Sequence, residues 1–123
     1  MLVEDDVSVR DFIRAVLRTH GYRVLVPAHP QDAELLHDEN HGRIDLLLSD
    51  VIMPEISGAE LAKRLAARNP QLKVLFMSGY IGDDVVRQGI QENDAPFLQK
   101  PFTPLTLARR VREILDGSRV KEI

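Results

Sequence analysis

Cysteine is absent from this chain, and aromatic residues make up only 5% of it. Without cysteine the protein can form neither disulfides nor thiolate metal sites. No apolar stretch approaches the roughly 20 residues that a transmembrane helix needs, and the first residues do not follow a signal-peptide pattern. The formal net charge of -3 provides no basic footprint for nucleic acid. These absences predict a soluble, cytoplasmic domain that contacts neither nucleic acid nor membrane directly.

The composition is that of an ordinary globular protein. Hydrophobic residues make up 44% and charged residues 28% of the 123 residues, so neither disorder nor low complexity is expected. A chain of this length fits one domain with one main core. We expect that domain to span residues 1–117, followed by a short tail, 118–123. Residues 1–3 resemble the end of a truncated first strand. We therefore expect the sequence to begin inside a longer protein.

Short apolar runs alternate with amphipathic segments along the whole chain. The runs are Met1–Val3, Val24–Val26, Leu46–Leu48, Val74–Met77 and Phe97–Leu98. They are too continuous for a strand with one solvated face, and they suit a parallel sheet that is covered on both faces. The expected helices are Val9–Leu17, Pro30–His37, Ser57–Ala66, Asp83–Gln91 and Thr103–Leu115. The pattern predicts an α/β fold of five βα units with right-handed crossovers.

Local signals mark where three of these helices begin. Ser57 with Glu60 three residues later is a capping box, and Thr103 before Pro104 is an N-cap followed by proline at the first helical position. Asp6 is the expected N-cap of the first helix. Each of these three helices therefore starts a few residues after a predicted strand ends.

Polar side chains gather at the carboxyl ends of the predicted strands, where doubly wound sheets place their working sites. They are Glu4, Asp5 and Asp6 after the first strand, Asp50 after the third, Ser78 after the fourth and Lys100 after the fifth. Two carboxylates about 4 Å apart repel by roughly 4 kcal/mol at an effective dielectric near 20. Such a cluster therefore needs a cation or should titrate abnormally.

The chemistry of this cluster points to phosphoryl transfer. Oxygen ligands without nearby His or Cys favour a hard ion such as Mg²⁺, which takes one or two carboxylates, waters and a phosphate oxygen. Lys100 would add a movable positive charge and Ser78 a hydrogen bond. Asp50 would be the nucleophile, as in enzymes that form an aspartyl phosphate.

Four motifs, "VEDD", "SDVIMPEISG", "FMSGY" and "FLQKPF", occur at successive strand ends in this order. With them the chain resembles, over its whole length, the receiver domain of bacterial two-component response regulators. The resemblance implies a flavodoxin-like sheet with strand order 2-1-3-4-5, counting the expected strands along the chain. The wording "KVLFMSGY" and "FLQKPFTPLTLARRVREIL" most resembles receivers at the C-terminal end of hybrid sensor histidine kinases.

The resemblance implies a phosphorelay function for the cluster. A phosphoryl group would pass from a kinase phosphohistidine to Asp50, with Mg²⁺ or Mn²⁺ held by Glu4, Asp5, Asp50 and the main-chain carbonyl of Ile52. The residues leave two registers of the acidic pair open, Glu4 with Asp5 or Asp5 with Asp6, and we favour the first. The domain would assist its own phosphorylation and dephosphorylation, acting as a switch more than as an enzyme.

The resemblance also implies how the signal spreads. Lys100 would contact the phosphoryl oxygen, Ser78 would be the hydroxyl switch and Phe97 the aromatic switch. The surface formed by Asp83–Gln91, the last strand and the last helix would change conformation. The bond between Lys100 and Pro101 resembles one that is cis in the family.

The implied partner is a histidine kinase or a histidine phosphotransfer domain, and the resemblance also allows a kinase core in the same chain and a phosphorylation-dependent homodimer. Three other functions compete with this interpretation. A flavodoxin-like FMN module would need phosphate-binding backbone N–H groups after the first strand, where this chain has three acids. A phosphatase resembling the haloacid dehalogenase family would need D-x-D there. A degenerate receiver that only docks proteins would not need Asp50, Ser78 and Lys100 together.

Overall fold

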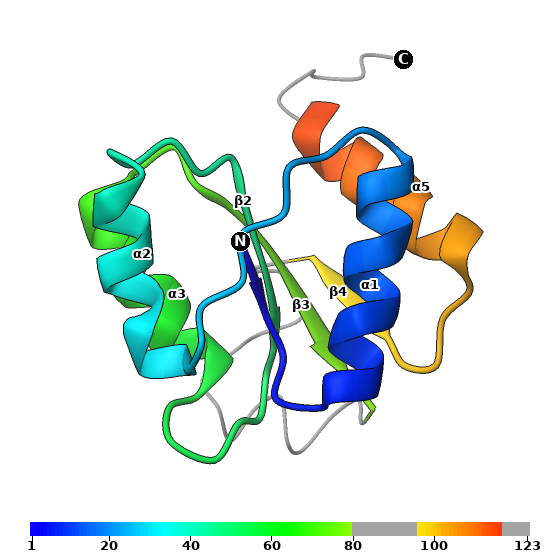
Figure 1. Cartoon of the computed structure of the whole chain (residues 1–123), viewed down its shortest axis with the longest axis horizontal. Helices are drawn as coiled ribbons and strands as arrows, with labels where there is room; N and C mark the ends of the chain where they lie inside the picture. Colours follow the sequence, from blue (N-terminus) through cyan, green and yellow to red (C-terminus); the bar gives the residue numbers. More distant parts are fainter. Residues whose placement is uncertain (80–95, 117–123) are drawn as a thin grey trace.

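The computed structural model describes residues 1–79 and 96–116 (Figure 1). The strands are β1 (Leu2–Val3), β2 (Leu46–Asp50), β3 (Lys73–Ser78) and β4 (Phe97–Gln99). The helices are α1 (Val7–Thr19), η1 (Pro30–Asp32), α2 (Ala33–Glu39), α3 (Gly58–Arg68) and α5 (Pro104–Asp116). The helix predicted at Asp83–Gln91 and the tail 118–123 lie outside the described residues. Among the described helices, none has the length and apolar character to cross a bilayer.

The strands form a parallel sheet between two helical layers. Within the described residues the sheet has four strands in the order β1-β2-β3-β4, each pair parallel. Helices α2 and α3 cover one face, and α1 and α5 cover the other (Figure 1). The expected α/β fold with both sheet faces covered is confirmed.

Successive strand residues feed two separate cores, as the side-chain alternation of a strand requires. Leu47 and Phe76 pack with α2 and α3 residues on one face. Leu48 and Leu75 pack with α1 and α5 residues on the other. All four side chains are buried. This explains why the strand sequences are continuously apolar.

The segment Val24–Val26 occupies the place expected for a strand but is not assigned as one. It runs beside β1, and the Leu2 N–H donates to the carbonyl of Leu25 at 2.8 Å. These three residues are not assigned as a strand, whereas β1 pairs with β2. The observed order β1-β2-β3-β4 matches the first, third, fourth and fifth of the expected strands, which were predicted to be neighbours in that order.

The helix starts follow the local signals. The Val9 N–H donates to Asp6 Oδ1, the Glu60 N–H to Ser57 Oγ and the Thr106 N–H to Thr103 Oγ1, each at 3.1 Å. The Asp6, Ser57 and Thr103 N-caps are therefore confirmed. These caps satisfy N–H groups that the first helical turn leaves without partners. The second half of the capping box is not formed, because the Glu60 carboxylate accepts from Arg64 instead.

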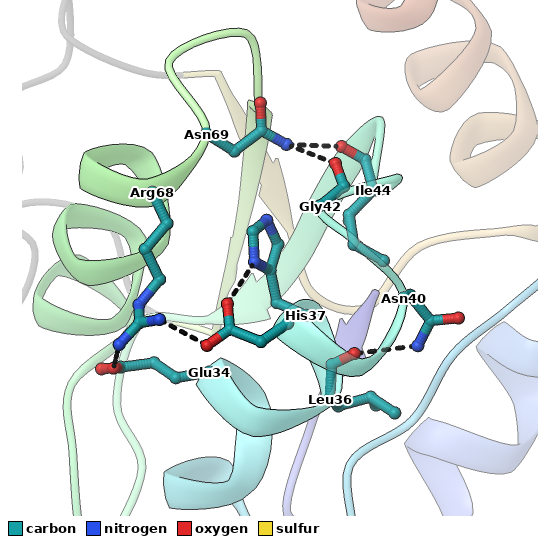
Figure 2. A network of polar contacts seen from close by, with 9 residues as sticks. Glu34, Leu36, His37, Asn40, Gly42, Ile44, Arg68 and Asn69 are labelled. Carbon is teal, nitrogen blue, oxygen red and sulfur yellow. Dashed lines mark hydrogen bonds and ion pairs between the residues drawn. The ribbon is translucent and has the colours of Figure 1, made fainter.

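A polar network joins α2 to α3 at the opposite end of the strands from the acidic residues (Figure 2). Arg68 of α3 pairs with Glu34 and Asp38 of α2. Asn69 donates from its amide nitrogen to the carbonyls of Gly42 and Ile44, each at 3.1 Å. This network fixes the loop that leads into β2.

His37 lies inside that network. Its side chain is buried, and its Nδ1 lies 3.3 Å from Asp38 Oδ1 (Figure 2). His37 is therefore a packed residue of α2, which continues to Glu39 and so extends two residues beyond the predicted helix.

Candidate functional site

The carboxyl ends of the strands bring the predicted polar residues together. In Figure 1 the arrows of β1, β2 and β3 point toward the same edge of the sheet. Asp50 is the last residue of β2 and pairs with Met77 of β3. Glu4 follows β1 directly, and Lys100 follows β4. The sheet order therefore carries side chains 96 residues apart in sequence into one site.

Lys100 connects the two principal carboxylates of this site. Its Nζ donates to Glu4 Oε1 at 2.7 Å and to Asp50 Oδ2 at 3.1 Å. The side chains of Glu4, Asp50 and Lys100 are 1%, 16% and 22% exposed. Because the ion pairs are sheltered from water, their charges interact more strongly than surface charges do. The single positive charge of Lys100 offsets part of the repulsion between the two carboxylates.

Burial perturbs the pKa of Glu4. Loss of solvent raises the pKa of this carboxyl from 4.5 to about 7; the Lys100 hydrogen bond opposes the shift, and the nearby Asp50 carboxylate adds to it. Glu4 Oε2 is buried and has no hydrogen-bond partner among the residues that the structure describes. A buried acceptor without a partner is costly. Glu4 is therefore held in an arrangement that a proton or a cation would relieve.

The pKa of Lys100 shifts in the direction that keeps the lysine charged. Burial lowers the pKa, but the hydrogen bonds and charges of Glu4 and Asp50 outweigh burial, so the pKa is raised overall. Lys100 stays an ammonium group throughout the physiological pH range.

The donor set fits a hard divalent cation. Glu4, Asp5 and Asp50 each offer one carboxylate oxygen, and these oxygens lie within 4.8 Å of one another. Glu4 and Asp50 line the sheltered part of the cluster, whereas Asp5 is exposed. Carboxylate oxygens are the ligands that Mg²⁺ and Mn²⁺ prefer. The observation that supports this fit is Glu4 Oε2, a buried acceptor that has no donor within residues 1–79 and 96–116.

Asp6 does not join the cluster. Its carboxylate caps α1, and it is absent from the group of three acids that share the site. Among the described residues, the geometry thus favours Glu4 with Asp5 over Asp5 with Asp6 as the acidic pair.

Ser78 and Phe97 lie at neighbouring strand ends. Ser78 is buried as the last residue of β3, and its carbonyl accepts from the Lys100 N–H at 2.9 Å. Phe97 is half-buried in β4, with its ring 5.9 Å from that of Phe76. The peptide bond between Lys100 and Pro101 is cis.

Ile52 lies in the loop after β2, with its side chain 44% exposed. The Val51 carbonyl accepts from the Gly58 N–H at 2.8 Å, and this bond closes the loop against α3. Sequence reasoning assigned Gly58 only to the turn. In the fold, Gly58 also lies close to the Asp50 carbonyl, and the sequence signal for this contact is a glycine at the first position of a capped helix.

A cavity of about 280 Å³ lies at the amino-terminal ends of the strands, away from this cluster. Leu17, Val111 and Leu115 line it among other residues. It brings together no group of three acids, histidines or cysteines, as judged from the described residues. The candidate functional site is therefore the cluster of Glu4, Asp5, Asp50 and Lys100 at the carboxyl ends of the strands, which we call the acidic edge.

Comparison with known proteins identifies the family. The family model of the response regulator receiver domain matches residues 1–112. The chain belongs to this family. As a receiver domain it is a module of two-component signalling, as its motifs indicated.

Individual relatives agree with this assignment. The receiver domain is 36% identical over 116 residues to a protein named sensor kinase CckA from Brucella abortus (strain 2308), covering 94% of this chain and 12% of that protein. It is 34% identical to the response regulator receiver protein CpdR from the same organism, covering 94% of each. The chain thus spans a small fraction of the first relative and nearly all of the second.

Solved structures give the same result. The crystal structure of the receiver domain from the hybrid histidine kinase CckA shares 40% sequence identity, with a TM-score of 0.77, covering 93% of this chain and 95% of that one. The chemotaxis protein CheY4 of Vibrio cholerae shares 25% identity, with a TM-score of 0.79, covering 92% and 94% of the two chains. The predicted likeness to receivers of hybrid histidine kinases is confirmed.

Proposed function

We propose that this receiver domain accepts a phosphoryl group on Asp50 from a phosphohistidine. The observation that carries the proposal is the pairing of Lys100 with both Glu4 and Asp50 in a sheltered site. An Asp50 carboxylate oxygen would attack phosphorus, the P–N bond of the donor would break, and its electron pair would remain on the imidazole. The product on Asp50 is an acyl phosphate.

Glu4, Asp5, Asp50 and the Ile52 carbonyl would hold Mg²⁺ or Mn²⁺ beside this reaction. When bound, the cation neutralises the negative charge of the phosphoryl oxygens. Lys100 supplies a further positive charge, and it would exchange a carboxylate partner for a phosphoryl oxygen. Catalysis then consists of positioning and electrostatic stabilisation by groups that the fold already holds.

Phosphorylation would replace the single negative charge of the Asp50 carboxylate by a phosphoryl group that carries about -1.5 to -2 and several acceptor oxygens. We propose that Ser78 and Phe97 respond to it, and that the surface formed by β4 and α5 changes conformation. Support comes from the position of Ser78 at the end of β3, one strand away from Asp50. The half-buried ring of Phe97 lies on the neighbouring strand. The added charge would bias a two-state element.

The expected donor is a histidine kinase or a histidine phosphotransfer domain in the cytoplasm, including a kinase core in the same chain. Large apolar side chains support docking of a protein at the acidic edge. Val7, Ile52 and Leu105 follow three of the strand ends in sequence and are 56%, 44% and 65% exposed. Apolar side chains exposed near a functional site are typical of protein contacts. A phosphorylation-dependent homodimer stays a prediction, which sedimentation with and without phosphoryl donor would check.

Incubation with acetyl phosphate and Mg²⁺, followed by intact mass measurement, tests the proposal. We expect wild type to gain one phosphoryl group, and Asp50→Asn to gain none. A phosphorylated Asp50→Asn variant would contradict the assignment of the acceptor. If wild type stays unmodified and also fails to bind beryllofluoride, the alternative of a degenerate receiver that only docks proteins would replace the proposal.

A further inference from the structure

Gly58 packs directly against the backbone of Asp50. It is buried at the start of α3, and a Cβ atom added to it would lie 2.3 Å from the Asp50 carbonyl oxygen and 3.2 Å from the Asp50 carbonyl carbon. Real Cβ atoms essentially never approach another atom closer than 3.0 Å. Any side chain at position 58 must therefore displace either α3 or the strand end that carries Asp50.

Ser49 acts on the same peptide group from within β2. Its side chain is fully buried, and its Oγ donates to the Asp50 carbonyl oxygen at 2.9 Å. The Ser49 Oγ also lies 3.2 Å from the position of a Cβ on Gly58. The hydroxyl of Ser49 and the α-carbon of Gly58 thus both pack against the carbonyl group of Asp50.

The peptide groups after Asp50 are held as firmly. The Val51 N–H donates to the Met77 carbonyl at 3.0 Å, and the Val51 carbonyl accepts from the Gly58 N–H at 2.8 Å. The Asp50–Val51 peptide is thereby restrained at its nitrogen by β3 and at its oxygen by Ser49 and Gly58. The next peptide, which leads into Ile52, is restrained by Gly58.

We infer that Gly58 and Ser49 are positioning residues for the phosphoacceptor. The missing side chain of Gly58 lets α3 lie against the strand end, and the Ser49 hydroxyl sets the orientation of the Asp50 carbonyl. Together they hold the Asp50 carboxylate and the Ile52 carbonyl in one geometry. The inference rests on the proposed function of Asp50, and it adds which residues make that carboxylate rigid.

The physical reason is the sensitivity of this chemistry to distance. A displacement of about 1 Å in a reacting group can cost about 100-fold in rate. Mg²⁺ in addition demands a nearly ideal octahedral arrangement. A backbone shift that relieves a 2.3 Å contact therefore affects both cation binding and phosphorylation.

The test compares Gly58→Ala and Ser49→Ala with Leu65→Ala. Leu65 is buried on the same helix α3, in the core, so its truncation weakens α3 without a side chain pressing on Asp50. The readouts are the Mg²⁺ dissociation constant by calorimetry, the rate of phosphorylation by acetyl phosphate at saturating Mg²⁺, and unfolding by urea. All variants are compared where urea unfolding shows them folded.

We expect Gly58→Ala to raise the Mg²⁺ dissociation constant and to slow phosphorylation by about tenfold or more. Ser49→Ala should slow phosphorylation several-fold, and Leu65→Ala should lose stability but keep its rate within about twofold of wild type. If Gly58→Ala does not fold, Ser49→Ala decides alone, because removing a hydroxyl introduces no clash.

If folded Gly58→Ala binds Mg²⁺ and is phosphorylated as wild type is, the inference is overturned while phosphorylation of Asp50 stands. If Gly58→Ala does not fold, the same result in Ser49→Ala overturns it. An equal loss of rate in Leu65→Ala would overturn it too, because the effect would then be general destabilisation. An unmodified wild type would instead overturn the proposed function, and the inference with it.

Discussion

Two clusters in this molecule each pair one basic side chain with two carboxylates, and they differ in burial. At the acidic edge, Glu4, Asp50 and Lys100 are 1%, 16% and 22% exposed. Between α2 and α3, the side chains of Glu34, Asp38 and Arg68 are 28%, 49% and 44% exposed. In the first cluster, burial raises the pKa of Glu4 to about 7, and one buried Glu4 oxygen has no partner in the described part of the chain.

The second cluster has milder electrostatics. The pKa of Asp38 is lowered, first by its hydrogen bond from His37 and then by Arg68. Solvent-exposed pairs of this kind contribute about 0 to 1 kcal/mol. The comparison teaches that burial, and not the number of charges, separates a chemically poised cluster from one that only joins two helices.

The largest expected effect comes from removing the positive charge of the acidic edge. Lys100→Met leaves the Glu4 and Asp50 carboxylates facing each other and removes the charge that would meet the phosphoryl group. We expect the rate of phosphorylation by acetyl phosphate to fall by about 100-fold or more. Intact mass measured over time checks this, and a rate within about threefold of wild type would remove Lys100 from the site.

The same substitution should also cost stability. Glu4 Oε1 would lose the Lys100 donor, and Glu4 Oε2 already has none among the described residues, so both oxygens of this buried side chain would lack partners there. We expect the free energy of unfolding at pH 8 to fall by about 1 to 3 kcal/mol, as urea titration would measure. An unchanged or higher value would mean that Glu4 gains another partner or keeps its proton at no cost.

The pH dependence of stability sharpens the comparison further. The folded-state pKa of Glu4, about 7, lies above its ordinary value of 4.5, so the folded state holds the Glu4 proton more tightly than the unfolded state. The contribution of Glu4 to stability is therefore highest below about pH 4.5, and it declines as pH rises from there to about 7. We expect a loss of about 1 to 2 kcal/mol over this window in protein freed of metal by chelation.

Glu4→Gln is the matched control for this measurement, because it mimics the protonated side chain at every pH. Relative to Glu4→Gln, wild type should lose free energy of unfolding as pH rises. A difference that stays constant from pH 4.5 to about 8 would show that Glu4 titrates normally.

The smallest expected effect is in the α2–α3 cluster. Arg68→Ala removes ion pairs to Glu34 and Asp38 that are open to solvent. We expect a loss of no more than about 1 kcal/mol in the free energy of unfolding, reduced further by salt. The rate of phosphorylation should stay at the wild-type value; a slower rate in folded protein would show that this network is coupled to the acidic edge.

Much of the fold could be predicted from local patterns. Continuous apolar runs such as Leu46–Leu48 indicate strands buried on both faces, and the caps at Ser57 and Thr103 mark helix starts. These features depend on neighbours in sequence, so the chain shows them directly. Val24–Val26 is not assigned as a strand, although the Leu2 N–H donates to the Leu25 carbonyl, because strand pairing depends on segments that are distant in sequence.

The βα alternation can be recognised from the sequence alone, and so can the polar residues at or just after the strand ends, among them Glu4, Asp50 and Lys100. Those follow from periodicity and from the rule that parallel strands end at one edge. The folded structure is needed to see how deeply Glu4 is buried, which carboxylates Lys100 joins, and that Gly58 has no room for a side chain beside Asp50. Burial and close contact are properties of segments brought together from distant regions of the chain, which no local pattern of residues specifies.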